Sequence, residues 1–303
     1  MLVPAFAKIN LTLEVLGLQA GGYHEVKTVL QTVNLTDQID IQPGPNLKVD
    51  CDVPGLNGEA NLVWRAAVEL AESRRIRPKA RIMIRKRIPV AMGLGGGSSD
   101  AAAALIGLNK LWNLCLDPEE LAQIAASLGS DVPFFLRGGT ALAEGRGKEI
   151  SPLPSLPQLG VLLICPKETV PNKTATLFSR LTAGHYSDGG ITRQMVATLM
   201  SGQFVMDMVH NVFEEVAFNV FPGLGAIYRR LEGLTSSRPR LSGAGPALFC
   251  LPAGPEDFSR VSQALPPHQG RAYLVQTITP DMAASKSRIP GPPISGSSTS
   301  STK

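Results

Sequence analysis

The 303-residue sequence has few cysteines, few charged residues and no long apolar run. Cys51, Cys115, Cys165 and Cys250 are far apart and form no C-x-x-C pair, which argues against a zinc site and predicts buried, reduced thiols. The longest apolar runs, such as residues 161–165, fall far short of the roughly 20 residues that a membrane span needs. No basic segment followed by an apolar stretch opens the chain, so we expect a cytoplasmic protein with no membrane partner.

Concentrated positive charge is also missing. The formal net charge is +4, and Lys286, Arg288 and Lys303 supply most of it from a segment that holds no acid. The rest of the chain is therefore nearly neutral, without the positive field that binding to nucleic acid requires. We expect small-molecule ligands and no nucleic-acid partner.

What is present is a chain with 44% hydrophobic residues, enough to build a packed core. At roughly 150 residues per domain this length predicts two domains. A proline-punctuated stretch at 151–159 divides them, so we predict domains over 1–155 and 156–284, with the last strand free to return to the first domain. Residues 285–303 are rich in Ser, Thr, Gly and Pro, which predicts a disordered tail. Strands and helices interleave without regular alternation, which favours an α+β fold.

Three helices have clear start signals. Asn61 is the expected N-cap of a helix over 61–75, and Asp117 with Glu120 forms a capping box whose helix stops at Gly129. The third helix, over 98–112, has Ser and Asp at its start.

The first strand is predicted over residues 3–17, where apolar side chains alternate with polar ones. This pattern is typical of a strand that is buried on one face only. Lys8 and Asn10 share the polar face, two residues apart. That face is either a solvated surface or part of a polar site.

The most informative segment is Pro89–Ser99, PVAMGLGGGSS, whose glycines lead directly into a helix. Bare backbone amides and the positive end of a helix dipole make a phosphate cradle. The segment is neither a P-loop nor a dinucleotide fingerprint, because no Lys-Ser/Thr pair follows and Ser98 takes the place of the last glycine. The alternative is a flexible turn capped by serine.

Other candidates are weaker on their own. The glycine loop at 241–249 fits a plain turn or a ligand contact, and Asp131 in GSDVPFF fits a turn or a carboxylate set among apolar residues. Tyr23 and His24 fit ordinary packing or a ligand site. The polar turn with Glu144, Arg146 and Lys148 is expected to be solvated, and the remaining histidines have no metal-ligand spacing.

Taken in order, AKINL, GYHE, GLGGGSSDAA, GSDVPFF and SGAGPALF resemble the GHMP small-molecule kinases over roughly residues 5–250. AKINL with GYHE and GSDVPFF is specific to the branch that acts on a cytidyl substrate. The resemblance implies an amino-terminal α+β domain joined to a ferredoxin-like carboxy-terminal domain, with the active site in the interdomain cleft. It implies ATP-dependent phosphorylation of the 2-hydroxyl of a cytidyl diphosphate alcohol in isoprenoid precursor synthesis.

The resemblance also implies residue roles. Lys8 and Asp131 would be the catalytic pair, Asn10 would contact the substrate, and Tyr23 and His24 would bind its cytosine. A second aromatic that completes the cytosine site in the family has no clear counterpart here. The residues implied to bind ATP are Pro89, Val90, Ala91, Met92, Gly93, Leu94, Gly95, Gly96, Gly97, Ser98, Ser99, Asn61, Lys86, Ser242, Gly243, Ala244 and Gly245.

ATP is expected with Mg²⁺ that phosphate oxygens and water hold, since the sequence offers no side-chain metal site. We expect a monomer or a weak homodimer. Two alternatives stay open at this point. One is a GHMP kinase that acts on mevalonate or homoserine, and the other is a catalytically silent nucleotide-binding protein.

Overall fold

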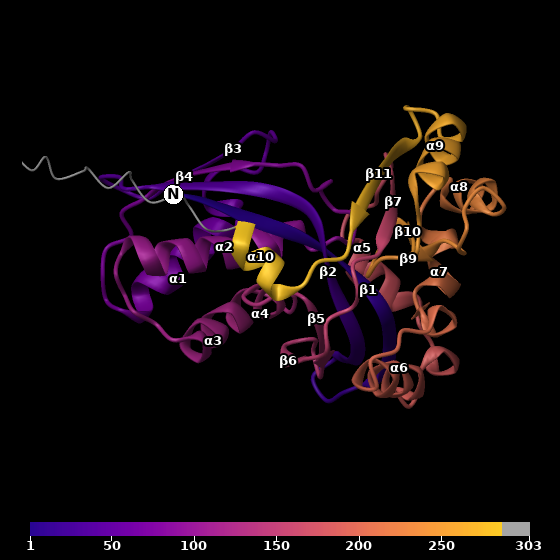
Figure 1. The fold of residues 1–303 in the computed structure, drawn as a ribbon. Helices are drawn as coiled ribbons and strands as arrows, with labels where there is room; N and C mark the ends of the chain where they lie inside the picture. The colour runs from indigo at the N-terminus through magenta and orange to yellow at the C-terminus, as the bar shows by residue number, and fades with distance from the viewer. Residues whose placement is uncertain (287–303) are drawn as a thin grey trace, which may run out of the picture.

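The computed structural model describes residues 1–286, which form two sheets and the helices around them (Figure 1). The first sheet runs β3–β4–β2–β1–β8, with β5 paired to β2 and β6 to β5. Its strands are β1 (Leu2–Leu18), β2 (His24–Gln42), β3 (Lys48–Cys51), β4 (Arg81–Arg85), β5 (Thr140–Glu144), β6 (Glu149–Pro152) and β8 (His210–Asn211).

Helices cover one face of this sheet, as the left half of Figure 1 shows. They are α1 (Leu62–Ser73), α2 (Gly96–Leu111), α3 (Pro118–Leu128) and α4 (Val132–Phe135). The predicted caps of α1 and α3 are confirmed: the Asn61 side chain accepts from the Val63 amide at 2.9 Å, and Asp117 and Glu120 form the capping box. The predicted start of α2 was late, because Gly95, in left-handed conformation with φ 73°, takes the N-cap position and no side chain caps the helix.

The second sheet has the antiparallel order β11–β7–β10–β9. Its strands are β7 (Gly160–Pro166), β9 (Arg240–Leu241), β10 (Leu248–Cys250) and β11 (Gly270–Gln276). Helices α7 (Glu214–Val220) and α8 (Leu224–Leu231) lie between β7 and β9 in the chain, and α9 (Pro255–Ala264) lies between β10 and β11. This order of strands and helices is the ferredoxin-like arrangement, so the α+β fold with a ferredoxin-like second half is confirmed.

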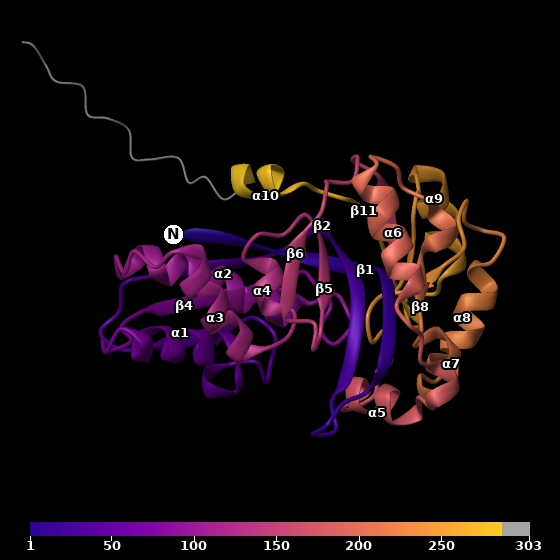
Figure 2. The same cartoon turned by 90° about the horizontal axis from the view of Figure 1, so that it is seen from below.

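Other segments link the two halves. Helices α5 (Lys173–Arg180) and α6 (Gly190–Met200) follow β7, and β8 then pairs with β1 of the first sheet. The short 3₁₀ turns are Gly58–Ala60, Ala183–His185 and Met206–Met208. After β11, the Ile278 amide donates to the Thr32 carbonyl of β2 at 3.1 Å, and helix α10 (Pro280–Lys286) lies beside the first sheet in both views (Figure 2).

The predicted division at residue 155 falls between β6 and β7 and stays a prediction. β8 pairs with β1 of the first sheet, and Thr277, directly after β11, forms an isolated antiparallel bridge with Val33 of β2. Residues 285 and 286, which we assigned to a disordered tail, end α10, and the rest of that predicted tail lies outside the described residues.

The prediction that β1 is buried on one face only is wrong. Lys8, Asn10, Thr12 and Glu14 on its polar face are each no more than 3% exposed. The reason is that β1 and β2 form a long hairpin that continues into the second half of the molecule, where α6 covers this face. The Thr192 amide donates to Glu14 Oε2 at 2.6 Å, and the Thr192 hydroxyl donates to Thr12 Oγ1 at 2.9 Å.

All four cysteines are free thiols, and burial raises the pKa of Cys165 and of Cys250 to about 12. Two depart from the expected burial, since Cys115 is exposed and Cys51 is half-buried. Within residues 1–286, we find no helix with the length and apolar character of a membrane span.

Candidate active site

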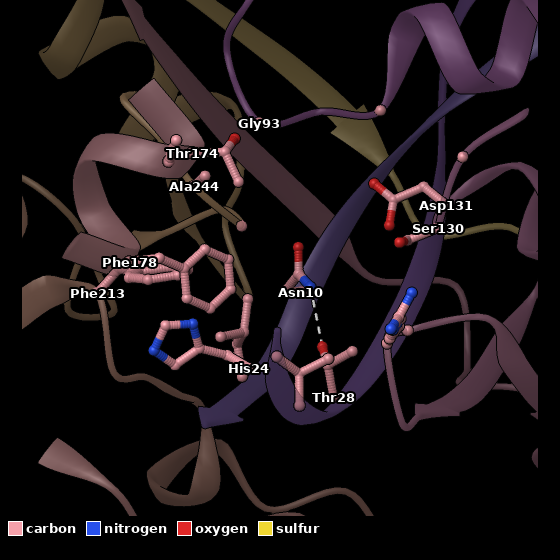
Figure 3. Close-up of a pocket in the computed structure, with 18 of the residues that line it drawn as sticks. Asn10, His24, Thr28, Gly93, Ser130, Asp131, Thr174, Phe178, Phe213 and Ala244 are labelled. Atoms are coloured by element: carbon pink, nitrogen blue, oxygen red, sulfur yellow. Dashed lines mark hydrogen bonds between the residues drawn. The ribbon is translucent and has the colours of Figure 1, made fainter. Parts of the chain in front are cut away.

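A cavity of about 920 Å³ lies where the two halves meet. Residues from both halves of the molecule line it. Figure 3 shows Asp131 on one side, Phe178 and His24 on the other, and Asn10 of β1 between them. The predicted site residues on its wall are Lys8, Asn10, Tyr23, His24, Gly93, Gly95, Ser98, Asp131, Gly243 and Ala244. The structure therefore brings the candidate catalytic, substrate and loop residues to one cleft.

Lys8 and Asp131 form an ion pair in this cavity, with 3.7 Å between Nζ and Oδ2. The lysine is buried, whereas the carboxylate side chain is 36% exposed toward the cavity. Burial lowers the pKa of Lys8, and the negative charge of Asp131 acts in the opposite direction. Asp131 lies at the start of α4, but its side chain does not cap the helix. The ion pair therefore excludes two alternatives left open by the sequence: a solvated surface for Lys8 and a plain turn residue for Asp131.

A short chain of hydrogen bonds orients Asn10. Lys8 Nζ donates to Asn10 Oδ1 at 2.5 Å, and Asn10 Nδ2 donates to Thr28 Oγ1 at 2.8 Å (Figure 3). The Thr28 hydroxyl donates in turn to the Thr12 carbonyl. These bonds fix the Asn10 amide with its oxygen toward Lys8, a constraint on the site that the sequence pattern did not reveal.

An aromatic corner closes the far end of the cavity. The His24 ring stacks on Phe178, with 4.7 Å between ring centroids and 24° between planes, and His24 Nε2 lies 3.2 Å from the Tyr186 hydroxyl. Phe178 of α5 is a second aromatic ring at this end of the cavity. Its ring reaches His24 at the start of β2, a contact between distant segments that no local sequence pattern predicts.

Tyr23 differs from its neighbour His24. Its side chain is 52% exposed, and the guanidinium carbon of Arg146 lies 3.5 Å from the ring centroid. The polar turn at 144–148 is thus more than a set of solvated charges, since Arg146 and Lys148 line the cavity and Glu144 pairs with Lys27 at 2.9 Å.

The glycine loop forms one wall of a second cavity of about 340 Å³. Every predicted loop residue from Pro89 to Ser98 lines it, as do Asn61 and Lys86, while Ser99 is buried behind it. At Gly97 an added Cβ would meet no heavy atom within 4 Å, so the amino end of α2 opens onto free space. The structure thus offers main-chain amides and a helix terminus to an anion.

The second glycine loop supports the first. An added Cβ at Gly93 would stand 2.2 Å from the Ser242 carbonyl oxygen, and Ser242 Oγ donates to the Gly93 carbonyl at 3.2 Å. Gly243 and Ala244 line the larger cavity, whereas Ser242 and Gly245 line neither of the two. Their predicted contact with ATP stays a prediction.

Lys86 is held below the loop by two carboxylates. Its Nζ donates to Asp37 Oδ2 at 2.5 Å and to Asp100 Oδ2 at 2.6 Å. Asp37 Oδ1 also accepts from the amides of Arg87 and Ile88, at 2.5 and 2.8 Å. Burial raises the pKa of Asp100 to about 7 against the opposing charge of Lys86. Lys86 therefore lines this cavity with its ammonium already paired, and its predicted contact with the nucleotide stays a prediction.

Asn61 is similarly occupied, because its side chain caps α1 and donates to the Leu56 carbonyl at 2.7 Å. Within residues 1–286, His, Cys, Asp and Glu side chains form no group of three or more that could hold a metal ion. This cavity therefore offers an anion the main-chain amides of the glycine loop, while the ammonium of Lys86 is already paired.

The comparison with known proteins shows which class of protein has this cleft between a glycine loop and a lysine–carboxylate pair. Residues 61–139 match the family model described as the GHMP kinases N terminal domain. The chain belongs to the GHMP kinases and is a small-molecule kinase.

Relatives within that family share one description. A 4-diphosphocytidyl-2-C-methyl-D-erythritol kinase of Dehalococcoides mccartyi is 38% identical over 275 residues, which are 90% of this chain and 97% of that protein. A kinase of the same description from Bacillus cereus is 37% identical over 92% of this chain and 97% of its own length. Our chain belongs to this branch of the family.

Solved structures agree on the fold. A crystal structure of 4-(cytidine 5'-diphospho)-2C-methyl-D-erythritol kinase superposes with a TM-score of 0.76 at 33% identity, covering 91% of this chain and 99% of that one. The mevalonate kinase of Methanococcus jannaschii gives 0.66 at 15% identity over 92% and 98% of the two chains, which is a likeness of fold alone.

Proposed function

We propose that this protein transfers the γ-phosphoryl group of ATP to the 2-hydroxyl of 4-diphosphocytidyl-2-C-methyl-D-erythritol, giving the 2-phosphate and ADP in the non-mevalonate route to isoprenoid precursors. The observation that carries the proposal is the position of the Lys8–Asp131 pair, which stands in one cavity with the glycine loop and the aromatic corner. An acceptor held by its cytosine at His24 would extend its alcohol toward Asp131.

On the donor side, the glycine loop and the amino end of α2 would hold the triphosphate. The open space at Gly97 and the exposed amides of the loop fit phosphate oxygens. Mg²⁺ would neutralise part of the phosphate charge, and the phosphates themselves with water would be its ligands.

The proposed roles of the side chains follow from the loose transition state of phosphoryl transfer, in which positioning and charge stabilisation supply most of the acceleration. Asp131 would orient the acceptor hydroxyl and take up its proton at a carboxylate oxygen. Lys8 would face the charge that develops on the transferring group, and Asn10 would hold its ammonium in place.

A coupled assay with purified protein tests the proposal. ADP should form only when both ATP and the cytidyl diphosphate alcohol are present, and ³¹P NMR should show a new monoester on the product. Equal consumption of ATP with and without this alcohol would contradict the proposal. Turnover with mevalonate or homoserine in its place would favour the alternatives within the family.

Phe178 provides a prediction about the acceptor site. Phe178→Leu keeps an apolar side chain against Phe213 but removes the ring that faces His24. Stacking of a base on an aromatic ring is worth about 1–3 kcal/mol, so KM for the cytidyl substrate should rise about 5- to 150-fold. KM for ATP should stay unchanged in the same steady-state measurements.

Phe218→Leu is the matched control, since Phe218 is an exposed ring on α7. It should leave both KM values unchanged. Equal increases in both KM values for Phe178→Leu would mean that the substitution disturbs the fold instead of the cytosine site.

A further inference from the structure

Lys173, the first residue of α5, lies where the two cavities meet. Within the described residues, the walls of both cavities share Gly93, Gly95, Ser98 and Lys173. The first three belong to the glycine loop. Lys173 is therefore the one charged side chain among the shared residues, and it comes from the second half of the molecule.

Within the part of the chain that the structure describes, no carboxylate lies within ion-pair distance of the Lys173 ammonium. Its hydrogen bond is to the Ala244 carbonyl at 3.1 Å. Lys86 provides the contrast, because two carboxylates hold it at 2.5 and 2.6 Å. The positive charge of Lys173 is thus available to an anion bound where the two cavities meet.

The surroundings of Lys173 favour an anion at that place. Burial lowers the pKa of Lys173 to about 8, the positive charge of Lys8 lowers it as well, and the charge of Asp131 raises it. Two lysines near one carboxylate leave a net positive charge at the junction. A phosphate group would relieve this imbalance and hold Lys173 in its protonated form.

We propose that Lys173 binds the phosphoryl group during its transfer, contacting phosphate oxygens at the junction of the donor and acceptor cavities. This inference rests on the proposed function, because it requires ATP as the donor. A group that passes from one cavity to the other must cross the wall that both share. Lys173 and the glycine loop lie on that wall, so they would hold the group from opposite sides.

The titration of Lys173 makes the proposal testable. A pKa of about 8 in the free enzyme means that the ammonium is mostly charged at pH 7 and mostly neutral at pH 9. Lys8 and Asp131 are the titratable groups whose charges act on Lys173. The other titratable residues that line the larger cavity are Tyr23, His24, Arg146 and Lys148. Those that line the second cavity are Lys86 and Asp100.

The experiment measures the Kd of MgATP by calorimetry at pH 7, 8 and 9 without any acceptor. For the unaltered protein we expect Kd to rise about tenfold from pH 7 to 9, as Lys173 loses its proton. Lys173→Arg keeps its charge over this range, so its Kd should stay nearly constant. Lys173→Met should bind about tenfold more weakly at pH 7 and show no change at higher pH. Lys8 and Lys173 interact through their charges, so the comparison that isolates Lys173 is the one between the unaltered protein and Lys173→Arg, which keeps a positive charge beside Lys8.

Lys110→Met, at an exposed position near the end of α2, is the control and should behave like the unaltered protein. Unchanged affinity and an unchanged pH profile in Lys173→Met would overturn the proposal for Lys173 while leaving the proposed function intact. Failure of the unaltered protein to bind MgATP would contradict the donor itself.

Kinetics provides the second readout. Lys173→Met should lower kcat about 100-fold or more, as loss of one group that stabilises transition-state charge does elsewhere. A rise confined to KM for the cytidyl substrate would assign Lys173 to the acceptor's diphosphate and would also overturn the proposal.

Discussion

Asp131→Asn is expected to lower kcat by about 100- to 10,000-fold, the usual contribution of a positioned acid or base, while both substrates still bind. Asparagine keeps the shape of the side chain but cannot accept the proton of the acceptor hydroxyl. It also removes the charge that opposes the effect of burial on Lys8, so the pKa of Lys8 should fall further. Steady-state kinetics and calorimetric binding of each substrate test the two parts of this expectation.

The control for Asp131→Asn is Asp188→Asn, which changes a carboxylate that is 80% exposed beside Arg193. It should keep the kcat of the unaltered protein. Full activity of Asp131→Asn would remove Asp131 from the mechanism. Loss of binding for both substrates would show that the cleft itself had been disturbed.

Asp37→Ala is expected to lower the free energy of unfolding by about 3–5 kcal/mol, the range for breaking one partner of a buried ion pair. Asp37 is fully buried, and its removal leaves Lys86 with one carboxylate and leaves the amides of Arg87 and Ile88 without their acceptor. Urea unfolding followed by circular dichroism measures this loss in the absence of nucleotide.

Asp40→Ala on the same strand is the matched control. Asp40 is partly exposed, and its ion pair with the amino terminus spans 3.9 Å, so its loss should change stability by no more than about 1 kcal/mol. A similar, small loss in both variants would show that the network under the glycine loop contributes little to folding.

Features determined within a few residues were predicted well from the sequence. The caps at Asn61 and Asp117 depend on hydrogen bonds to amides two or three residues away. The glycine loop is recognisable because its own residues are glycines, which allow the backbone conformations that it adopts. The motif order then led to the correct family. These are the parts of the fold and site whose physical causes lie in adjacent residues.

Features that depend on distant segments were not predicted. The polar face of β1 is buried because α6 packs over it, and the stacking of Phe178 on His24 joins α5 to β2. The role of Asp37 depends on Lys86, which follows β4 and is distant in the sequence. The place of Lys173 depends on the two cavities whose walls it joins, and no local sequence pattern shows it.

The β1–β2 hairpin limits how the molecule can move. Val3 and Ala5 at one end of β1 pack in the core of the first half, and Leu13 and Val15 at the other end pack in the core of the second. Lys8 and Asn10 lie midway between these anchors. A large rotation of one half relative to the other would have to bend the β1–β2 hairpin at Lys8 and Asn10. We therefore expect substrates to enter and leave when the exposed side chains of Tyr23 and Arg146 rearrange, while the β1–β2 hairpin keeps its shape.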